Sequence, residues 1–222
     1  MARAGADDVC AIGPIDVVLP AVQRFAQEVW RRCRLRLQWQ KTQLFAWDLN
    51  TVPGDGPDGL TLAGEMVEGV FERGFECYGI PIGTPVYVKH MLKKKAEEVV
   101  RDADQTAHLL SGDHQALWSA LRLSISHRFE YFCQLSPPSL VEPVAAWLDT
   151  EIWRILERAT GLNIPRGAEG EMVIRCPVTG LDNLSYQGWL VRLPVKLYGW
   201  GLRSLQETCG PAYLGALETA IP

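Results

Sequence analysis

Three long segments whose apolar residues recur at helical spacing constrain the fold of this chain more than any other feature. The segments are residues 86–110, 113–135 and 139–159. In each, apolar side chains return at intervals of three and four residues, the pattern of a helix with one buried face. Pro137 and Pro138 end the second segment, and Gly161 ends the third. Because the connections are short, the sequence predicts a bundle of helices over residues 84–161.

The residues on either side of this bundle are less regular. An amphipathic helix is predicted for residues 16–33, with Asp16 as its N-cap. Short strands are predicted at residues 35–38, 42–47, 60–63 and 75–80, a glycine- and proline-rich loop at residues 50–59, and a closing helix at residues 211–220. The predicted fold class is therefore α+β with a helical majority. Its parts are a few-stranded antiparallel sheet with one helix at 1–83, the bundle at 84–161, and an irregular tail at 162–222.

Composition limits the classes of function. The 222 residues carry a formal net charge of −4, which argues against a protein that coats nucleic acid through an excess of lysine and arginine. A local basic patch is still compatible with an acidic chain. The cysteines form no CxxC pair, which favours reduced thiols over a disulfide framework or a zinc site. No apolar run approaches the roughly 20 residues of a membrane span, so the sequence predicts a soluble intracellular protein with no membrane partner.

Two adjacent aspartates, Asp7 and Asp8, stand directly before a short apolar strand at residues 9–12. Carboxylate oxygens are the ligands that Mg²⁺ prefers in proteins. Most such pairs are solvated turns or helix caps, so the pair alone indicates little. Its context is more informative, because a helix, a second predicted strand and then Lys41 follow in that order.

This order resembles motifs C, D and E of a reverse transcriptase palm. The segment Phe75 to Gly83, FECYGIPIG, is similar to the motif E hairpin of reverse transcriptases from non-LTR retrotransposons. The segment Leu193 to Ser204, LPVKLYGWGLRS, resembles a block that recurs downstream of the polymerase core in the same elements. The likeness spans nearly the whole chain. It implies a partial palm at 1–83, a helical thumb at 84–161 and a post-thumb segment at 162–222.

The resemblance also implies a set of site residues. Asp7 and Asp8 match the metal-binding aspartates, with Mg²⁺ as cofactor, and Lys41 matches the motif D lysine near the leaving pyrophosphate. An RNA template and a DNA primer would be the partners, in the nucleus or the cytoplasm. The residues expected to touch the nucleic acid are Tyr78, Gly79, Ile80, Pro81, Gly83, Lys89, Lys93 and Lys94. The lysines belong to a basic stripe that Lys95 and Arg101 extend, for which a solvated helix face is the alternative interpretation.

The chain departs from the family pattern at the predicted metal site. Gly5 stands where the family has an aromatic residue, and six residues precede Asp7, with no motif A aspartate and no fingers segment among them. Two-metal phosphoryl transfer needs carboxylates on both ions, so we expect the 222 residues to be inactive alone, and another chain is a candidate source of the missing half. The alternative from another class is a helical binding or scaffold protein in which the aspartate pair is structural.

Overall fold

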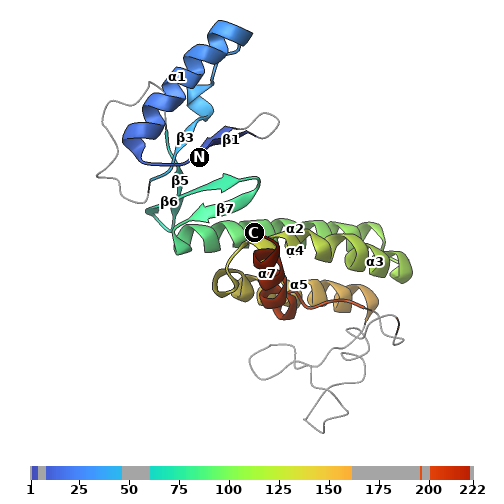
Figure 1. Cartoon of the computed structure of the whole chain (residues 1–222). Helices are drawn as coiled ribbons and strands as arrows, with labels where there is room; N and C mark the ends of the chain where they lie inside the picture. Colours follow the sequence, from blue (N-terminus) through green and yellow to red (C-terminus); the bar gives the residue numbers. More distant parts are fainter. Residues whose placement is uncertain (1, 5–8, 47–60, 162–195, 197–200, 221–222) are drawn as a thin grey trace. The chain divides into compact units, whose positions relative to one another are not determined.

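The computed structural model describes residues 2–4, 9–46, 61–161, 196 and 201–220, shown in colour in Figure 1. The chain divides into two compact units, the N-terminal unit of residues 1–75 and the helical unit of residues 76–222. Most of the described residues are helical and a small antiparallel sheet accompanies them, which confirms the predicted α+β class with a helical majority. The three-part division at residues 83 and 161 stays a prediction.

The N-terminal unit begins with two short paired strands and a long helix. Strand β1 (Ala2–Ala4) pairs antiparallel with β2 (Val9–Ala11). Helix α1 (Ile15–Cys33) follows, in agreement with the periodicity of its sequence. The predicted cap is wrong, because Pro14 occupies the N-cap and no side chain caps the helix. Asp16 instead lies in the first turn, where its negative charge interacts favourably with the positive end of the helix dipole.

The strands predicted after α1 are largely replaced by other structure. No strand forms at residues 35–38 in the described part of the chain, and η1 (Trp39–Lys41) is a turn of 3₁₀-helix. Strand β3 (Gln43–Leu44) is all that forms of the strand predicted at 42–47, and it pairs parallel with β4 (Thr61–Leu62). Alternation alone cannot make a strand, because a strand needs a neighbour for its hydrogen bonds and a core for its apolar face. Leu35 has neither here and is 63% exposed.

A three-stranded sheet in the order β5-β6-β7 follows: β5 (Gly64–Val67), β6 (Val70–Cys77) and β7 (Ile80–Gly83). Its two hairpins turn through Glu68-Gly69 and Tyr78-Gly79, and all four of these residues have positive φ angles. Two consecutive residues with positive φ are typical of the two-residue hairpin turn whose twist matches that of the paired strands. The strand predicted at residues 75–80 is therefore the end of β6, a turn and the first residue of β7.

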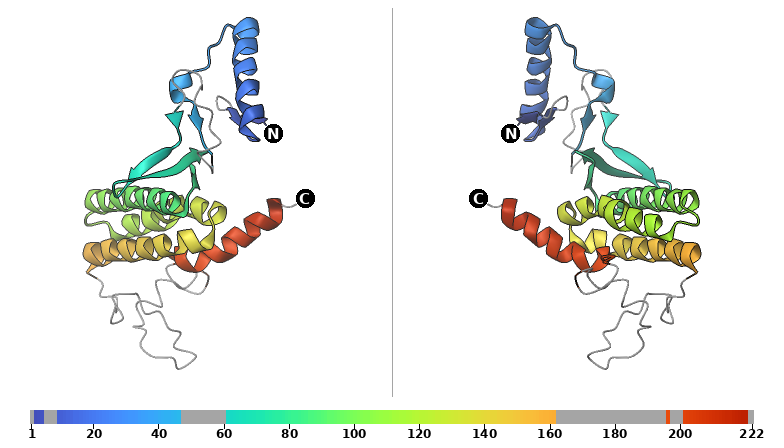
Figure 2. Two further views of the ribbon diagram at one scale, coloured as in Figure 1. Left: turned by 90° about the vertical axis from the view of Figure 1, so that its left-hand side faces the viewer. Right: turned by 90° about the vertical axis from the view of Figure 1, so that its right-hand side faces the viewer.

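Long helices make up the helical unit, as predicted. Helix α2 (Pro85–Leu109) begins at Thr84, whose hydroxyl accepts a hydrogen bond from the Tyr87 amide at 3.3 Å. Helix α5 (Pro138–Thr160) ends at Gly161 in a left-handed conformation, and α7 (Leu205–Ala220) begins six residues before the helix predicted at 211–220. Figure 2 shows α2 beside α5, and α7 packs on both α4 and α5.

The second predicted helix, residues 113–135, is not one continuous α-helix. It consists of α3 (His114–Ala120), a π-helical segment η3 (Leu121–Ile125), a 3₁₀ segment η4 (Ser126–Phe129) and α4 (Glu130–Leu135). Its buried apolar residues are spaced by four throughout: Leu117, Leu121, Ile125, Phe129 and Cys133. An α-helix of 3.6 residues per turn rotates such a series by about 40° at each step, away from any single core. Wider π geometry at Leu121–Ile125 offsets part of that rotation.

The described apolar core lies in the helical unit. Its largest fully buried side chains are Trp153, Phe129, Leu92, Leu117, Leu121, Leu148, Leu156 and Leu205. They come from α2, the α3–α4 region, α5 and α7, so one core holds all four together. In the described part of the N-terminal unit, the buried apolar side chains are Ala63 and Val67, and α1 buries none. None of the described helices is both long and apolar enough to cross a membrane.

Candidate nucleic-acid interface

The predicted metal site cannot be built from the described residues. Asp7 and Asp8 lie outside them, between β1 and β2 in the sequence. Within the described ranges, no group of three or more histidine, cysteine, aspartate or glutamate side chains could hold a metal ion. Lys41 is the last residue of η1 and is exposed, with no strand directly before it. The catalytic roles of these three residues therefore stay predictions.

The predicted hairpin, by contrast, is formed in full. Tyr78 has a φ of 51° and Gly79 a φ of 79°, and they make the two-residue turn between β6 and β7. Glycine is the residue that adopts such an angle without steric cost, which explains Gly79 at this position. The Tyr78 ring is 60% exposed, whereas Pro81 is buried. Ile80 and Gly83 are half-buried, so the hairpin presents Tyr78 and Gly79 outward at its tip.

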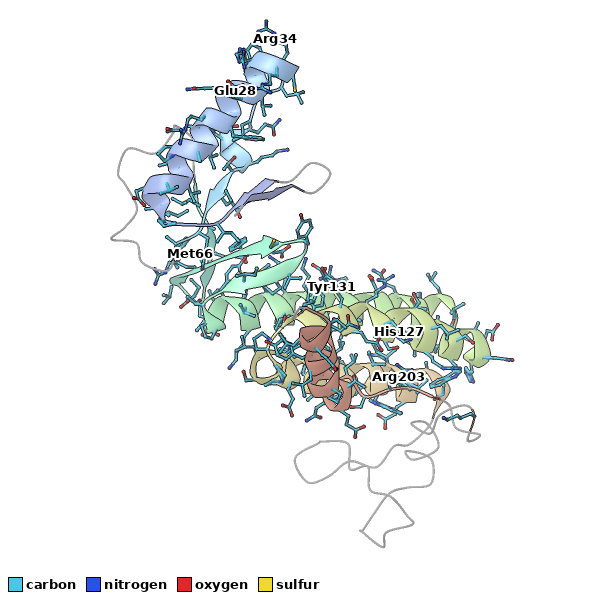
Figure 3. The ribbon with its side chains drawn as sticks, in the orientation of Figure 1. Glu28, Arg34, Met66, His127, Tyr131 and Arg203 are labelled. Atoms are coloured by element: carbon cyan, nitrogen blue, oxygen red, sulfur yellow. The ribbon has the colours of Figure 1, made fainter. Side chains whose placement is uncertain are left out.

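Two contacts tie this hairpin to the helices of the same unit. The Tyr131 hydroxyl, on α4, donates a hydrogen bond to the Tyr78 carbonyl oxygen at 3.2 Å, and Figure 3 labels Tyr131 beside the hairpin. Lys95, on α2, pairs with Glu76 of β6, with 3.6 Å between Nζ and Oε1. Sequence reasoning missed Tyr131 and Glu76, because their partners lie 53 and 19 residues away in the chain. Both contacts anchor the hairpin close to its tip, one at the turn itself and one on the strand just before it.

The predicted basic stripe on α2 does not form one face. Successive residues of an α-helix point about 100° apart, so Lys93, Lys94 and Lys95 face three directions. Lys93 lies over the Trp147 ring of α5, with Nζ 2.7 Å from the ring centroid, a cation–π contact. Burial lowers the pKa of Lys93, against the opposing effect of Glu97 and Glu151. Lys95 is held by Glu76.

The remaining cations of α2 are exposed. Lys94 and Arg101 are seven residues apart and therefore lie on the same side of the helix, whereas Lys89 lies closer to the side of Lys93. Arginines on the neighbouring helices are paired with acidic groups: Arg128 with Asp102, Arg154 with Glu151, and Arg158 with Asp104. The basic surface of the helical unit is therefore smaller than the sequence suggests, and Lys89, Lys94 and Arg101 are its exposed part on α2.

A buried carboxylate that sequence reasoning missed lies in the middle of α5. Asp149 is 5% exposed and accepts hydrogen bonds from the Ser204 hydroxyl at 2.8 Å, the Leu205 amide at 3.0 Å and the Gln206 amide at 3.2 Å. Ser204 in turn accepts one from the Glu207 amide at 3.2 Å. The first amides of α7, which no residue of that helix can satisfy, are thus capped by a carboxylate from another helix.

This cap gives a physical reason for the end of the Leu193–Ser204 block. In its described residues, Leu202 is 2% exposed and belongs to the core, and Ser204 is buried against Asp149. The role visible here is structural, since these residues fix α7 to α5. Residues 193–195 and 197–200 of the block lie outside the described residues. The only sequence signal for the cap was an aspartate among the apolar residues of the segment 139–159.

Two buried thiols lie in the same core. Cys133 of α4 is 1% exposed and Cys209 of α7 is 2% exposed, and both are free. Burial raises the pKa of Cys133 to about 12, helped by the charges of Cys209 and Asp149. Burial raises the pKa of Cys209 as well. Since the thiolate is the reactive form, neither group is suited to nucleophilic chemistry at neutral pH.

Taken together, the described residues offer a binding surface more than a reactive centre. An anchored hairpin with an exposed tyrosine and an exposed set of cations on α2 are the parts able to contact a nucleic acid. Comparison with protein-family models, with curated proteins and with solved structures finds no match for this chain.

Proposed function

We propose that this chain is part of a reverse transcriptase of the non-LTR retrotransposon type, the part that holds the primer and the template. The observation that carries the proposal is the β6–β7 hairpin, which runs through the Thr84 cap directly into the first helix of a helical bundle. In the resemblance described above, a motif E hairpin precedes the thumb in this way. An RNA template and a DNA primer are the proposed partners, and the nucleus or the cytoplasm is the proposed location.

In this proposal the hairpin contacts the primer end and α2 contacts the duplex backbone. Tyr78 and Gly79, at the exposed tip, offer a ring and backbone groups to a sugar or base. Lys89 and Lys94 offer ammonium groups to phosphates, which positions a duplex without reading its sequence. Lys93, which the sequence placed in the same role, is the weakest of these candidates because its Nζ lies over Trp147.

Mg²⁺ binding by Asp7 and Asp8, with Lys41 near a leaving group, is retained as the catalytic part of the proposal. Two-metal phosphoryl transfer needs carboxylates on both ions. In the 222 residues we recognise one motif that could supply them, the pair Asp7 and Asp8. We therefore expect no Mg²⁺-dependent primer extension by the purified chain. Extension that Asp7→Asn abolishes would show that the chain is an active polymerase.

Binding of an RNA–DNA hybrid tests the proposal directly. The measurement is fluorescence anisotropy of a labelled hybrid at low salt, followed by a salt titration. The double variant Lys89→Gln/Lys94→Gln should lower the salt slope by about 1.8, given roughly 0.9 per phosphate contact. The matched control is Arg154→Gln/Arg158→Gln, which removes the same charge from side chains paired with Glu151 and Asp104. Absence of binding at low salt, or equal losses in both variants, would contradict the proposal.

A helical binding or scaffold protein is the second candidate, and one observation favours it. Two lysines of the predicted stripe have partners within the protein, since Lys93 lies over Trp147 and Lys95 pairs with Glu76. If the hybrid experiment gives no binding, this candidate takes the place of the first.

A further inference from the structure

We infer that the C-terminal end of α1 binds the phosphate backbone of single-stranded RNA, through an arginine collar formed by Arg31, Arg32, Arg34 and Arg36. This site is formed by residues of the N-terminal unit and includes no residue of the hairpin or of α2. It therefore stands or falls independently of the function proposed above. None of the residues of the collar was expected to bind nucleic acid from the sequence.

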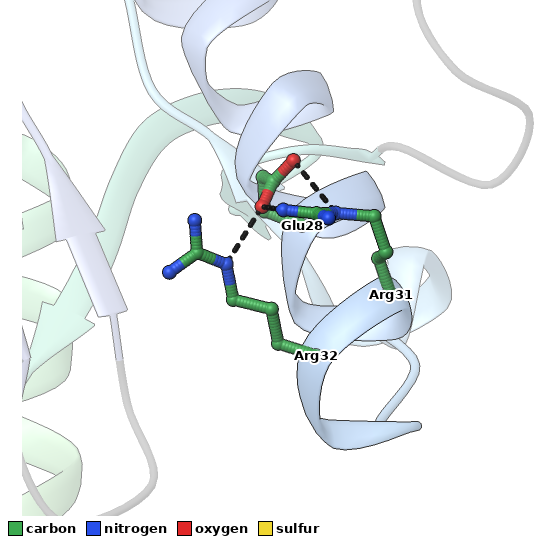
Figure 4. Close-up of polar contacts among 3 residues, drawn as sticks. All are labelled: Glu28, Arg31 and Arg32. Atoms are coloured by element: carbon green, nitrogen blue, oxygen red, sulfur yellow. Dashed lines mark hydrogen bonds and ion pairs between the residues drawn. The ribbon is translucent and has the colours of Figure 1, made fainter.

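The first observation is the concentration of positive charge. Four guanidinium groups lie within six residues, and Glu28 is the carboxylate that two of them, those of Arg31 and Arg32, share. Glu28 accepts hydrogen bonds from Arg31 at 2.8 Å and 3.2 Å and from Arg32 at 2.8 Å, as Figure 4 shows. These bonds, that from Arg31 first, lower the pKa of Glu28, so it stays ionised. One negative charge is thus set against four positive ones.

The second observation is the arrangement of the other two arginines around an indole. The guanidinium carbon of Arg36 lies 4.7 Å from the Trp30 ring centroid, and that of Arg34 lies 5.5 Å from it. Trp30 itself is 41% exposed. A guanidinium over an aromatic ring is held in place while its N–H groups stay available at the edges. Such a group is pre-organised for a phosphate oxygen, which it can bind through two hydrogen bonds.

The third observation is the backbone of Arg34. Its φ is 57°, in the left-handed region, and its amide donates to the Trp30 carbonyl oxygen at 3.1 Å to end the helix. Glycine is the usual residue at such a position, because any side chain there costs conformational energy. An arginine here therefore carries a backbone cost that a glycine would avoid. Figure 3 labels Arg34 at this end of α1.

A purely structural role explains only half of the collar. Cations in the last turn of a helix are stabilised by its negative end, which accounts for Arg31 and Arg32. Arg34 and Arg36 lie beyond the last helical residue, Cys33, and their guanidinium groups lie over the Trp30 ring. All four side chains are exposed, and none of the bonds described above removes their charge from solvent.

A flexible polyanion such as single-stranded RNA fits the collar better than a flat anionic lipid surface does. Trp30 and Glu28 point about 200° apart on the helix, so Arg31 and Arg32 lie on one side and the Trp30 pair on another. A single strand can follow phosphate sites around a helix end, whereas a lipid surface meets one side at a time. A helix that lies on a membrane has cations along the length of its polar face, whereas the arginines of the collar gather at one end of α1.

The test is binding of a labelled oligouridylate of about 16 nucleotides, the upper end of common single-strand site sizes, to the full 222-residue chain. The variant Arg34→Gln/Arg36→Gln should lower affinity about tenfold at low salt and reduce the salt slope by about 1.4, given roughly 0.7 per phosphate contact. The control Arg154→Gln/Arg158→Gln removes the same charge elsewhere and should change affinity less than about threefold. Trp30→Leu keeps every charge, so it should weaken binding without changing the salt slope.

Each contrary result overturns the inference. The absence of oligouridylate binding at low salt would exclude the site. Equal losses of affinity in the two double variants would mean that binding depends on net charge and not on the collar. Binding to phosphatidylserine vesicles that needs Arg34 and Arg36, without RNA binding, assigns the collar to a lipid surface instead. The Lys89→Gln/Lys94→Gln variant separates the two proposals: it should lower affinity for the RNA–DNA hybrid and leave oligouridylate binding intact. Unchanged hybrid affinity in this variant would contradict the hybrid proposal alone, whereas loss of oligouridylate binding would contradict the arginine collar.

Discussion

The two long helices α1 and α2 have the same amphipathic sequence pattern but differ in how much of their apolar face is buried. Each has apolar residues at helical spacing on one side and polar residues on the other. Helix α2 buries Tyr87, Val88, Met91, Leu92, Ala96, Val99 and Ala103, whereas α1 buries no residue. Periodicity therefore predicts that a helix has an apolar face, but not that another element of the chain covers it. Among the described residues, the same difference separates the helical unit, which has an extensive apolar core, from the N-terminal unit, whose buried apolar side chains are Ala63 and Val67.

The most direct way to break this comparison is to remove a large apolar side chain from each helix. Leu92→Ala, at a position of α2 with no exposure, should destabilise the protein by about 2–5 kcal/mol through lost burial and a cavity. Phe25→Ala in α1, where the ring is 41% exposed, should cost less than about 1.5 kcal/mol, since less area leaves contact with protein. Urea unfolding followed by circular dichroism measures both. Equal costs would mean that the apolar face of α1 is covered in solution.

A second prediction sharpens the comparison at the buried cap of α7. Asp149→Ala removes the acceptor of three hydrogen bonds from Ser204, Leu205 and Gln206, and leaves buried donors without it. We expect a loss of about 3 kcal/mol, the usual range for hydrogen bonds to a buried charge. Amide hydrogen exchange should show the first turn of α7 losing its protection.

The control for this prediction is an exposed carboxylate in the same unit. Asp104→Ala breaks an ion pair with Arg158 in which both side chains are more than half exposed, so it should cost less than about 1 kcal/mol. If Asp149→Ala were no more costly than this, the cap would not be what holds α7 in place.

The parts of the fold predicted correctly are those whose information is local. Helices α1, α2 and α5 follow from periodicity and from end signals such as Gly161. The strand at residues 35–38 was wrong because a strand depends on a neighbour elsewhere in the chain, which the pattern of one segment does not contain. The break in the helix predicted at residues 113–135 could have been predicted locally, because the apolar residues from Leu117 to Cys133 recur at every fourth position, which a regular α-helix does not keep on one face.

The candidate site divides in the same way. The hairpin was expected from the family resemblance, but the strand predicted at residues 75–80 ran through the turn at Tyr78-Gly79, because Tyr-Gly is not among the usual two-residue turn sequences. The division of the lysines was not predicted, since Lys93 is placed by Trp147 of α5 and Lys95 by Glu76 of β6. Asp149 was missed for the same reason, with partners 55 to 57 residues away. Asp7 and Asp8 lie outside the described residues, so their role is still a prediction from resemblance.

The buried thiol of Cys133 gives a prediction for pH. Its pKa is raised from 9.0 to about 12 in the folded protein, so the folded state holds this proton more tightly than the unfolded state does. The resulting stability is fully present below about pH 9 and is lost as the pH rises from about 9 to about 12. The free energy of unfolding of the native chain should therefore fall relative to that of Cys133→Ala by up to about 1.4 kcal/mol per pH unit in this window.

Urea titrations of both proteins at several pH values from neutral upward measure this difference. Thiol labelling at neutral pH supplies an independent check, in which Cys33, exposed at the end of α1, should react fast and Cys133 slowly. A constant difference between the two proteins across the alkaline range would show that the Cys133 thiol is not buried as described. Fast labelling of both cysteines in the native chain would show the same.

The smallest effect on the free energy of unfolding is expected at the hairpin tip, where a substitution should change local order more than global stability. Tyr131→Phe removes one exposed hydrogen bond to the Tyr78 carbonyl and should cost less than about 1 kcal/mol in unfolding. Its effect should instead be local, with faster exchange of the Gly79 amide. The turn at Glu68-Gly69, which joins β5 and β6, should not change and serves as the internal control. A tip unaltered by Tyr131→Phe would mean that the tight turn and the Lys95–Glu76 pair suffice to order it, and that α4 has no part in presenting Tyr78.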